Sequence, residues 1–255
     1  TALDDGSLSG GNNTAIGNST LTANTSGSAN TVVGSEAGLS ITTGSSNTLM
    51  GRSSGDAITT GDSNTAYGHT SLTDLSTGSF NTAIGREALQ KNTASSNTAV
   101  GYQALEENTS GSSNVAVGVT TLDANTTGSD NVAMGNGALG SNTTASSNTA
   151  IGHEALTANT TGDVNVAVGY AALTANTTAS ENTAVGHNAL DANTTGARNT
   201  GIGRRALGAN TTASDNTAVG KDALLSNTTG ASNVAVGTEA LDANTTANSN
   251  TAIGK

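Results

Sequence analysis

The residue types that most often bind metals or transfer protons are few in this sequence of 255 residues, and they recur at fixed places. The three histidines, His69, His153 and His187, each follow the same glycine of a repeated motif. His153 and His187 are two repeats apart, which is about 10 Å if each repeat adds one strand spacing. Zinc ligands lie about 2 Å from the metal, so these two histidines cannot share one ion within a chain. A solvated turn is favoured over a metal on a symmetry axis.

Acidic residues also recur without forming a site. Asp123, Asp191 and Asp242 occupy one position of the repeat, whereas glycoside cleavage needs two carboxyl groups at a defined separation in a cleft. The glycines around Gly135 belong to the repeat and do not form a phosphate loop, and the calcium-binding nonapeptide repeat is missing. We therefore expect no enzyme activity, no cofactor and no metal site.

One motif with a period of about 17 residues runs through the chain, and each copy begins at an asparagine. The step between these asparagines is constant, as from Asn182 to Asn199, except that the step from Asn81 to Asn97 is shorter by one. With this asparagine as position 1, position 5 is always Gly, position 9 is mostly Leu, and position 12 is mostly Asn followed by Thr. The starting asparagines are Asn13, Asn30, Asn47, Asn64, Asn81, Asn97, Asn114, Asn131, Asn148, Asn165, Asn182, Asn199, Asn216, Asn233 and Asn250.

This period predicts an all-β fold, a parallel β-solenoid of about fifteen coils of 17 residues. A first short strand is expected over the Thr/Val-Ala-Val/Ile segment at positions 2–4, where β-branched residues dominate. A second strand is expected through the Ala-Leu segment at positions 8 and 9, and Asn-Thr-Thr-Gly forms the other turn. Strands about 4.8 Å apart would make a rod about 70 Å long.

Residues at fixed positions should contact their own copies in neighbouring coils, so we predict three structural rows. Stacked asparagines can form an amide ladder, glycines turn the chain, and leucines fill the core. The Asn ladder includes Asn114, Asn131, Asn148, Asn165, Asn182, Asn199, Asn216 and Asn233. The turn glycines include Gly118, Gly135, Gly152, Gly169, Gly186, Gly203, Gly220 and Gly237. The core leucines include Leu122, Leu139, Leu156, Leu173, Leu190, Leu207, Leu224 and Leu241.

The whole chain, residues 1–255, is expected to be a single repeat array with two irregular parts. Residues 1–12 form an atypical first coil, residues 30–80 are degenerate, and residues 81–255 are regular. In the degenerate part, Gly38 and Gly55 replace the leucine, and Ile41, Ile58 and Leu75 replace the position-12 asparagine. The apolar volume lost at position 9 is thus replaced three positions later, which predicts locally repacked coils.

The composition of the chain argues against several classes of binding partner. The net charge of −11 disfavours binding to nucleic acid or to an anionic membrane. No stretch is long and apolar enough to insert into a membrane, and the absence of cysteine excludes disulfides and thiolate metal sites. Sugar-binding sites usually use exposed aromatic residues, and only Tyr67, Tyr102, Tyr170 and Phe80 are available here. Tyr102 and Tyr170 share position 6 and are candidate sugar contacts, but single exposed side chains are the favoured interpretation.

One face of the first strand should form an uncharged strip along the rod, because side chains of a strand alternate between its two faces. Position 3 is small and apolar, and such a strip usually marks an interface. We expect a homo-oligomer wound around it; an exposed strip on a monomer is the alternative. The candidate oligomer strip consists of Ala116, Ala133, Ala150, Ala167, Ala184, Ala218 and Ala235.

The segments NTAIG, NTAVG and NVAVG, each followed by an ALxxNTTG-like sequence, resemble the repeats of phage tail-fibre shafts. They are also similar to the head repeats of trimeric autotransporter adhesins of the YadA type, whose unit is shorter. The similarity covers Asn13 to Lys255. It implies a left-handed coil, assembly as a homotrimer, and an extracellular location on a virion tail fibre or a bacterial cell surface.

These observations predict a structural rod, the shaft segment of an extracellular fibre that projects a receptor-binding tip. Host attachment would then use a surface receptor bound through flanking domains. One alternative is a filament subunit that self-assembles end to end through open β edges. Another is a solenoid that binds a glycan or host protein through the variable positions 6 and 7. Ice binding is less favoured, because adjacent threonines such as Thr126 and Thr127 point to opposite faces.

Overall fold

The computed structural model describes residues 9–255, and this part of the chain confirms the predicted all-β parallel solenoid. Its secondary structure consists of fifteen short strands, one per coil. The chain divides into two compact units, one ending at Ser129 and the other spanning Asp130–Lys255. Most of the predicted atypical first coil, residues 1–8, lies outside the described residues.

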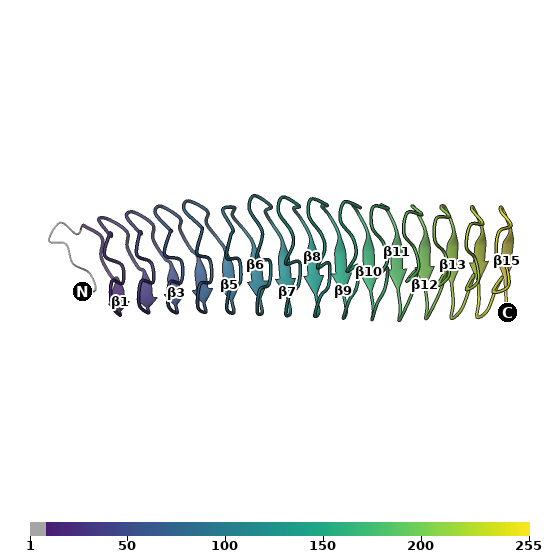
Figure 1. Ribbon diagram of the computed structural model, residues 1–255, viewed down its shortest axis with the longest axis horizontal. Helices are drawn as coiled ribbons and strands as arrows, with labels where there is room; N and C mark the ends of the chain where they lie inside the picture. The colour runs from purple at the N-terminus through teal and green to yellow at the C-terminus, as the bar shows by residue number, and fades with distance from the viewer. Residues whose placement is uncertain (1–8) are drawn as a thin grey trace. The chain divides into compact units, whose positions relative to one another are not determined.

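The strands of the first unit follow the chain in order and lie side by side (Figure 1). They are β1 (Thr14–Ile16), β2 (Thr31–Val33), β3 (Thr48–Met50), β4 (Thr65–Tyr67), β5 (Thr82–Ile84), β6 (Thr98–Val100) and β7 (Val115–Val117). Each strand pairs in parallel with the equivalent residues of the next coil, as in Thr65 with Thr82. The shorter step of the repeat keeps this register, because Thr82 still pairs with Thr98. The missing residue is therefore absorbed in the turn.

The second unit repeats the same arrangement with eight strands (Figure 1). They are β8 (Val132–Met134), β9 (Thr149–Ile151), β10 (Val166–Val168), β11 (Thr183–Val185), β12 (Thr200–Ile202), β13 (Thr217–Val219), β14 (Val234–Val236) and β15 (Thr251–Ile253). Ala167 pairs with Ala184, so identical repeat positions stack on one another. This in-register stacking explains why the fixed residues of the repeat are fixed.

The second strand predicted through the Ala-Leu segment was wrong. In each regular coil, positions 7 and 9 both have left-handed backbone conformations, for example Asn188 at φ 54° and Leu190 at φ 53°. Two left-handed residues curl this segment, so it cannot extend as a strand. It still bonds to its neighbours, because the N–H of Leu190 donates to the carbonyl of Ala206 at 3.0 Å.

The core is a column of small and medium side chains inside each unit. Within one coil, Ala184 from the strand and Ala189 and Leu190 from the curled segment are all fully buried. Gly201 stands at the strand position of the next coil, and a β-carbon there would lie 3.3 Å from the Leu190 side chain. The leucine therefore packs against the inner side of the strand, which leaves room for alanine but for little more.

A third left-handed residue occupies position 17 of each coil, and Val164 is the least suited to it. Its φ is 59°, its side chain is 55% exposed, and β-branched residues are disfavoured in this region. We predict that Val164→Asn raises the free energy of unfolding by about 1 kcal/mol, because asparagine tolerates the left-handed region. Urea unfolding checks this. Val119→Asn is the matched control, since Val119 is also exposed but does not have a positive φ; an equal gain in both variants would contradict the explanation.

Candidate functional site

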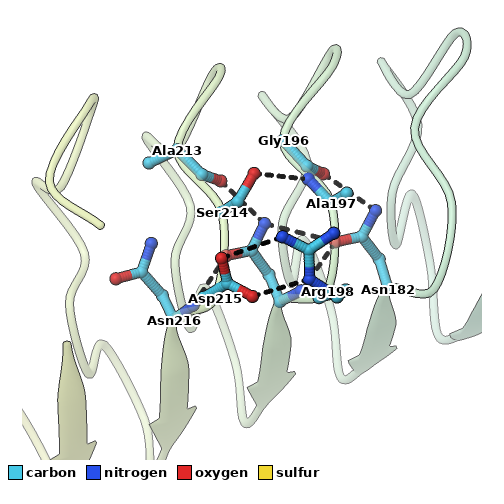
Figure 2. A network of polar contacts seen from close by, with 9 residues as sticks. Asn182, Gly196, Ala197, Arg198, Ala213, Ser214, Asp215 and Asn216 are labelled. Atoms are coloured by element: carbon cyan, nitrogen blue, oxygen red, sulfur yellow. Dashed lines mark hydrogen bonds and ion pairs between the residues drawn. The ribbon is translucent and has the colours of Figure 1, made fainter. Parts of the chain in front are cut away.

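The position-1 asparagines link neighbouring coils mainly through side chain to backbone bonds, as Figure 2 shows for the second unit. The Oδ1 of Asn182 accepts the backbone N–H of Asn199 at 2.9 Å, and the Oδ1 of Asn199 accepts that of Asn216 at 3.0 Å. The Nδ2 groups of Asn182 and Asn199 donate to the carbonyls of Gly196 and Ala213, at 2.9 and 2.8 Å. Each buried amide thus holds its own coil closed and also holds the next coil in register.

The position-12 asparagines form an amide-to-amide ladder between neighbouring coils. The Nδ2 of Asn193 donates to the Oδ1 of Asn176 at 3.1 Å, and the Nδ2 of Asn210 donates to the Oδ1 of Asn193 at 2.9 Å. Each Nδ2 also donates to the position-15 carbonyl of its own coil, as Asn193 does to Gly196 at 2.9 Å. Because the rows at positions 1 and 12 meet at this carbonyl, the turn between them is fixed from both sides.

The degenerate coils show the expected exchange of apolar volume. A β-carbon on Gly38 would lie 3.1 Å from the Cδ1 of Ile41, and one on Gly55 would lie 2.8 Å from the Cδ1 of Ile58. The isoleucines therefore occupy the space that leucine fills elsewhere. The exchange interrupts the amide ladder, and the buried Oδ1 of Asn24 has no hydrogen-bond partner, because the next coil has Ile41 in place of an asparagine.

The predicted turn glycines lie where the strand ends, in backbone conformations that only glycine adopts readily. Gly186 has a φ of +134°, and a β-carbon there would lie 2.6 Å from the carbonyl oxygen of Gly203. The predicted leucines are fully buried from Leu122 through Leu224, while Leu241 in the last described turn is partly exposed.

The assignment of the alanine row to an oligomer strip was wrong. All seven of these alanines are fully buried inside their own coil: Ala116, Ala133, Ala150, Ala167, Ala184, Ala218 and Ala235. The coil interior holds one small side chain from the strand because a leucine fills the space opposite. The larger side chains at positions 2 and 4 must therefore point outward.

The outward side chains of positions 2 and 4 form two uncharged columns, which we call the strand face. Position 2 is Thr or Val in every coil, and position 4 is Ile, Val, Met or Tyr. In the second unit, Met134 is 41% exposed, Ile151 37% and Ile202 40%. Eight strands at about 4.8 Å each make the strand face of this unit about 40 Å long. An apolar stripe of this length on a water-exposed surface is the strongest candidate for a functional surface.

Several side chains at position 6, directly after the turn glycine, contact the side chain at the same position of the neighbouring coil. The rings of His153 and Tyr170 are 5.3 Å apart and nearly parallel, and those of Tyr170 and His187 are 5.1 Å apart. In the first unit, the guanidinium of Arg86 lies 5.6 Å from the centre of the Tyr102 ring. The expectation that Tyr102 and Tyr170 are isolated side chains was therefore wrong, although both are exposed as expected. The shared repeat position of these residues was the signal that could have found the stack.

Ion pairs join the variable side chains of neighbouring coils. Arg198 and Asp215 form a two-point contact, at 2.7 and 3.0 Å (Figure 2). Arg205 makes the same contact with Asp222, whose side chain is 5% exposed, and this hydrogen bond lowers the pKa of Asp222. The Arg198–Asp215 pair is exposed at both side chains, and exposed pairs contribute little to stability.

Asp56 is an unfavourably placed carboxylate of the first unit. Burial raises its pKa, and the negative charges of Asp74 and Glu36 add to that effect, whereas backbone hydrogen bonds at Asp56 and Ala57 oppose it. Its buried Oδ1 has no hydrogen-bond partner. A carboxylate whose pKa is raised by folding destabilises the folded state above its unfolded pKa, and this penalty disappears as the pH falls through the folded pKa.

We predict that Asp56→Thr raises the free energy of unfolding by about 1 kcal/mol at neutral pH. Threonine occupies this position in two nearby coils, at Thr22 and Thr73. The gain should shrink as the pH is lowered, because the native aspartate becomes protonated; urea unfolding at a series of pH values measures this. Glu181→Ser removes one exposed negative charge elsewhere and is the control. If both variants gain equally, relief of net charge explains the result and the burial argument fails.

No group of three or more metal-ligating residues and no pocket was found among residues 9–255. In the same range, no helix is long and apolar enough to cross a membrane. The chain matches no protein-family model, and it matches no curated protein.

Proposed function

We propose that this chain is a structural segment of an extracellular fibre, in which identical chains associate side by side through the strand face. The observation that carries the proposal is the strand face itself, which is uncharged in every coil. Its outward Ile, Val, Met and Tyr side chains remain partly exposed in the single chain. Association would remove this apolar surface from water.

The coil architecture suits a spacer. Each coil repeats the same hydrogen bonds and adds one strand, so length scales with the number of repeats. The variable residues lie at the turns, while the residues that bind neighbouring coils are constant. Such a chain can be lengthened or shortened without a new fold.

Three parallel chains are the assembly that we propose, because the repeats resemble those of trimeric fibres. A closed ring of three copies places three equivalent strand faces around one axis, so each face meets another copy. The extracellular location that we propose rests on the same resemblance.

The experiment compares the mass in solution of the full chain with that of charged variants, by light scattering. The unmodified chain should have three times the chain mass of 24.6 kDa. Ile151→Glu combined with Ile202→Glu places charges on the strand face and should give the mass of one chain. Thr161→Glu combined with Thr212→Glu places the same charges on exposed turns of the same two coils and should leave the trimer intact. A single-chain mass for the unmodified protein would overturn the proposal.

A further inference from the structure

The stacked column at position 6 has an unusual composition for so acidic a chain. Five of the eight Lys and Arg residues stand there, as do all three histidines, and none of the 19 acidic residues does. The five are Arg52, Arg86, Arg204, Lys221 and Lys255. Basic residues are thus concentrated at one position of the repeat, while all of the acidic residues stand at other positions.

In the second unit, five consecutive coils present an exposed ring or cation at this position. We call this set the basic column: His153, Tyr170, His187, Arg204 and Lys221. We infer that the basic column binds a linear anionic polysaccharide, with the polymer running along the stacked coils. This inference does not depend on whether the chain is a fibre segment.

The geometry of the column favours an extended ligand. The three rings stack nearly face to face at 5.3 and 5.1 Å, and all three residues are exposed. The column therefore offers one hydrogen-bonding group per coil, at a repeat of about 4.8 Å. A sugar unit in an extended polysaccharide advances by about the same length, so successive sugars can meet successive coils.

The distribution of charged residues places the centre of the proposed binding site at His187 and Arg204. Arg204 makes no ion pair with any residue in the described part of the chain. The neighbouring position-7 residues in this stretch are Ala171, Asn188 and Arg205, none of which is acidic. A planar guanidinium without a partner is suited to a two-point contact with a carboxylate.

The two ends of the column are less positive. Glu154 lies 3.8 Å from the ring of His153, and Lys221 approaches Asp222 at 3.4 Å and Glu239 at 3.6 Å. These acids limit the positive stretch to the middle coils, so a polymer with one carboxylate per sugar fits better than a polymer of higher charge density.

Nucleic acid is the other linear polyanion, and two observations disfavour it. Duplex DNA carries one negative charge per about 1.7 Å, so the net charge of −11 repels it more strongly than a polymer with one carboxylate per sugar. The aromatic rings stack on one another, so their faces are not free to stack on bases.

The test uses the full chain at low salt with polygalacturonate, a homopolymer of a uronic acid, and measures the dissociation constant by titration calorimetry. Arg204→Thr should weaken binding about tenfold. Threonine stands at the same place in another coil, at Thr238, so the variant should fold. Arg198→Ser is the matched control, because it removes one cation from position 17, outside the column, and serine occupies that position in other coils.

The inference is supported if polygalacturonate binds, Arg204→Thr weakens it, Arg198→Ser does not, and dextran, a neutral polymer, does not bind. It is overturned if polygalacturonate does not bind, or if both variants lose the same affinity, since the binding would then follow net charge alone. Equal binding of dextran would contradict the anionic class. Equal or tighter binding of duplex DNA with the same sensitivity to Arg204→Thr would replace the polysaccharide by nucleic acid.

Discussion

Gly186→Ala is expected to lower the free energy of unfolding by about 3 kcal/mol, a large effect for the addition of one methyl group. Gly186 ends a strand at a φ of +134°, a conformation that other residues rarely adopt. The added β-carbon would also lie 2.6 Å from the carbonyl oxygen of Gly203 and 3.1 Å from the backbone nitrogen of Arg204. Both are backbone atoms of the next coil, so no flexible side chain can move aside. Urea unfolding of the variant measures the loss.

Gly208→Ala is the control for this prediction. Gly208 does not have a positive φ, and its added β-carbon would meet other atoms only at 3.2 Å and beyond. Other coils carry larger residues at this position, such as Asp191 and Leu225. The control should therefore change the free energy of unfolding by about 0.5 kcal/mol or less. Equal losses in the two variants would show that close stacking at the turn glycine is not what constrains the coil.

Asn199→Ala is the second variant with a large expected effect, again a loss of about 3 kcal/mol. The fully buried amide of Asn199 accepts the N–H of Asn216 at 3.0 Å and donates to the carbonyl of Ala213 at 2.8 Å. Alanine would leave the N–H of Asn216 without this acceptor, and it would leave a cavity between two coils. A buried polar group without a partner costs more than the bond itself was worth.

Denaturant unfolding followed by circular dichroism measures the loss in Asn199→Ala. Asn136→Ala is the matched control, because Asn136 is an exposed asparagine at position 6 of the same unit. We expect a change of about 0.5 kcal/mol or less for the control. A small loss of unfolding free energy for Asn199→Ala would mean that the asparagine row does not stabilise the fold.

Much of the architecture could be predicted from the period alone. A short repeat with fixed glycine and asparagine positions leaves little choice but stacked coils, and stacking places each residue on its own copy. The exchange of Gly38 and Ile41 for a leucine and an asparagine could also be read from the sequence. This exchange keeps the apolar volume of the coil, and comparison with the neighbouring repeats shows which residues have been exchanged.

The orientation of the strand could not be predicted in the same way. Alternation separates Ala184 from its neighbours Thr183 and Val185, but it does not say which side is inside. Which side faces the interior depends on how much of the interior the opposite segment of the coil fills. Leu190 of that segment has a left-handed backbone conformation, and its side chain fills the interior. Leucine has no preference for that conformation, so its left-handed backbone left no signal in the sequence.

The stack of Tyr170 between two histidines was missed for another reason. These residues are common on surfaces, and each alone predicts a solvated turn. Only the shared repeat position of His153, Tyr170 and His187 brings the rings together, at 5.3 and 5.1 Å. In a repeat protein, a variable position should therefore be read down the stack as well as along the chain.

The most direct test of the proposed assembly is oxidative cross-linking of a single cysteine on the strand face. The natural chain has no cysteine, so Val185→Cys introduces the only thiol. If identical chains meet through this face, oxidation should give a covalent dimer of twice the 24.6 kDa chain mass on a non-reducing gel. Thr195→Cys, on an exposed turn of the same coil, should stay uncross-linked. A Val185→Cys protein that remains a single chain, or a Thr195→Cys protein that cross-links equally well, would contradict the proposed side-by-side association through the strand face.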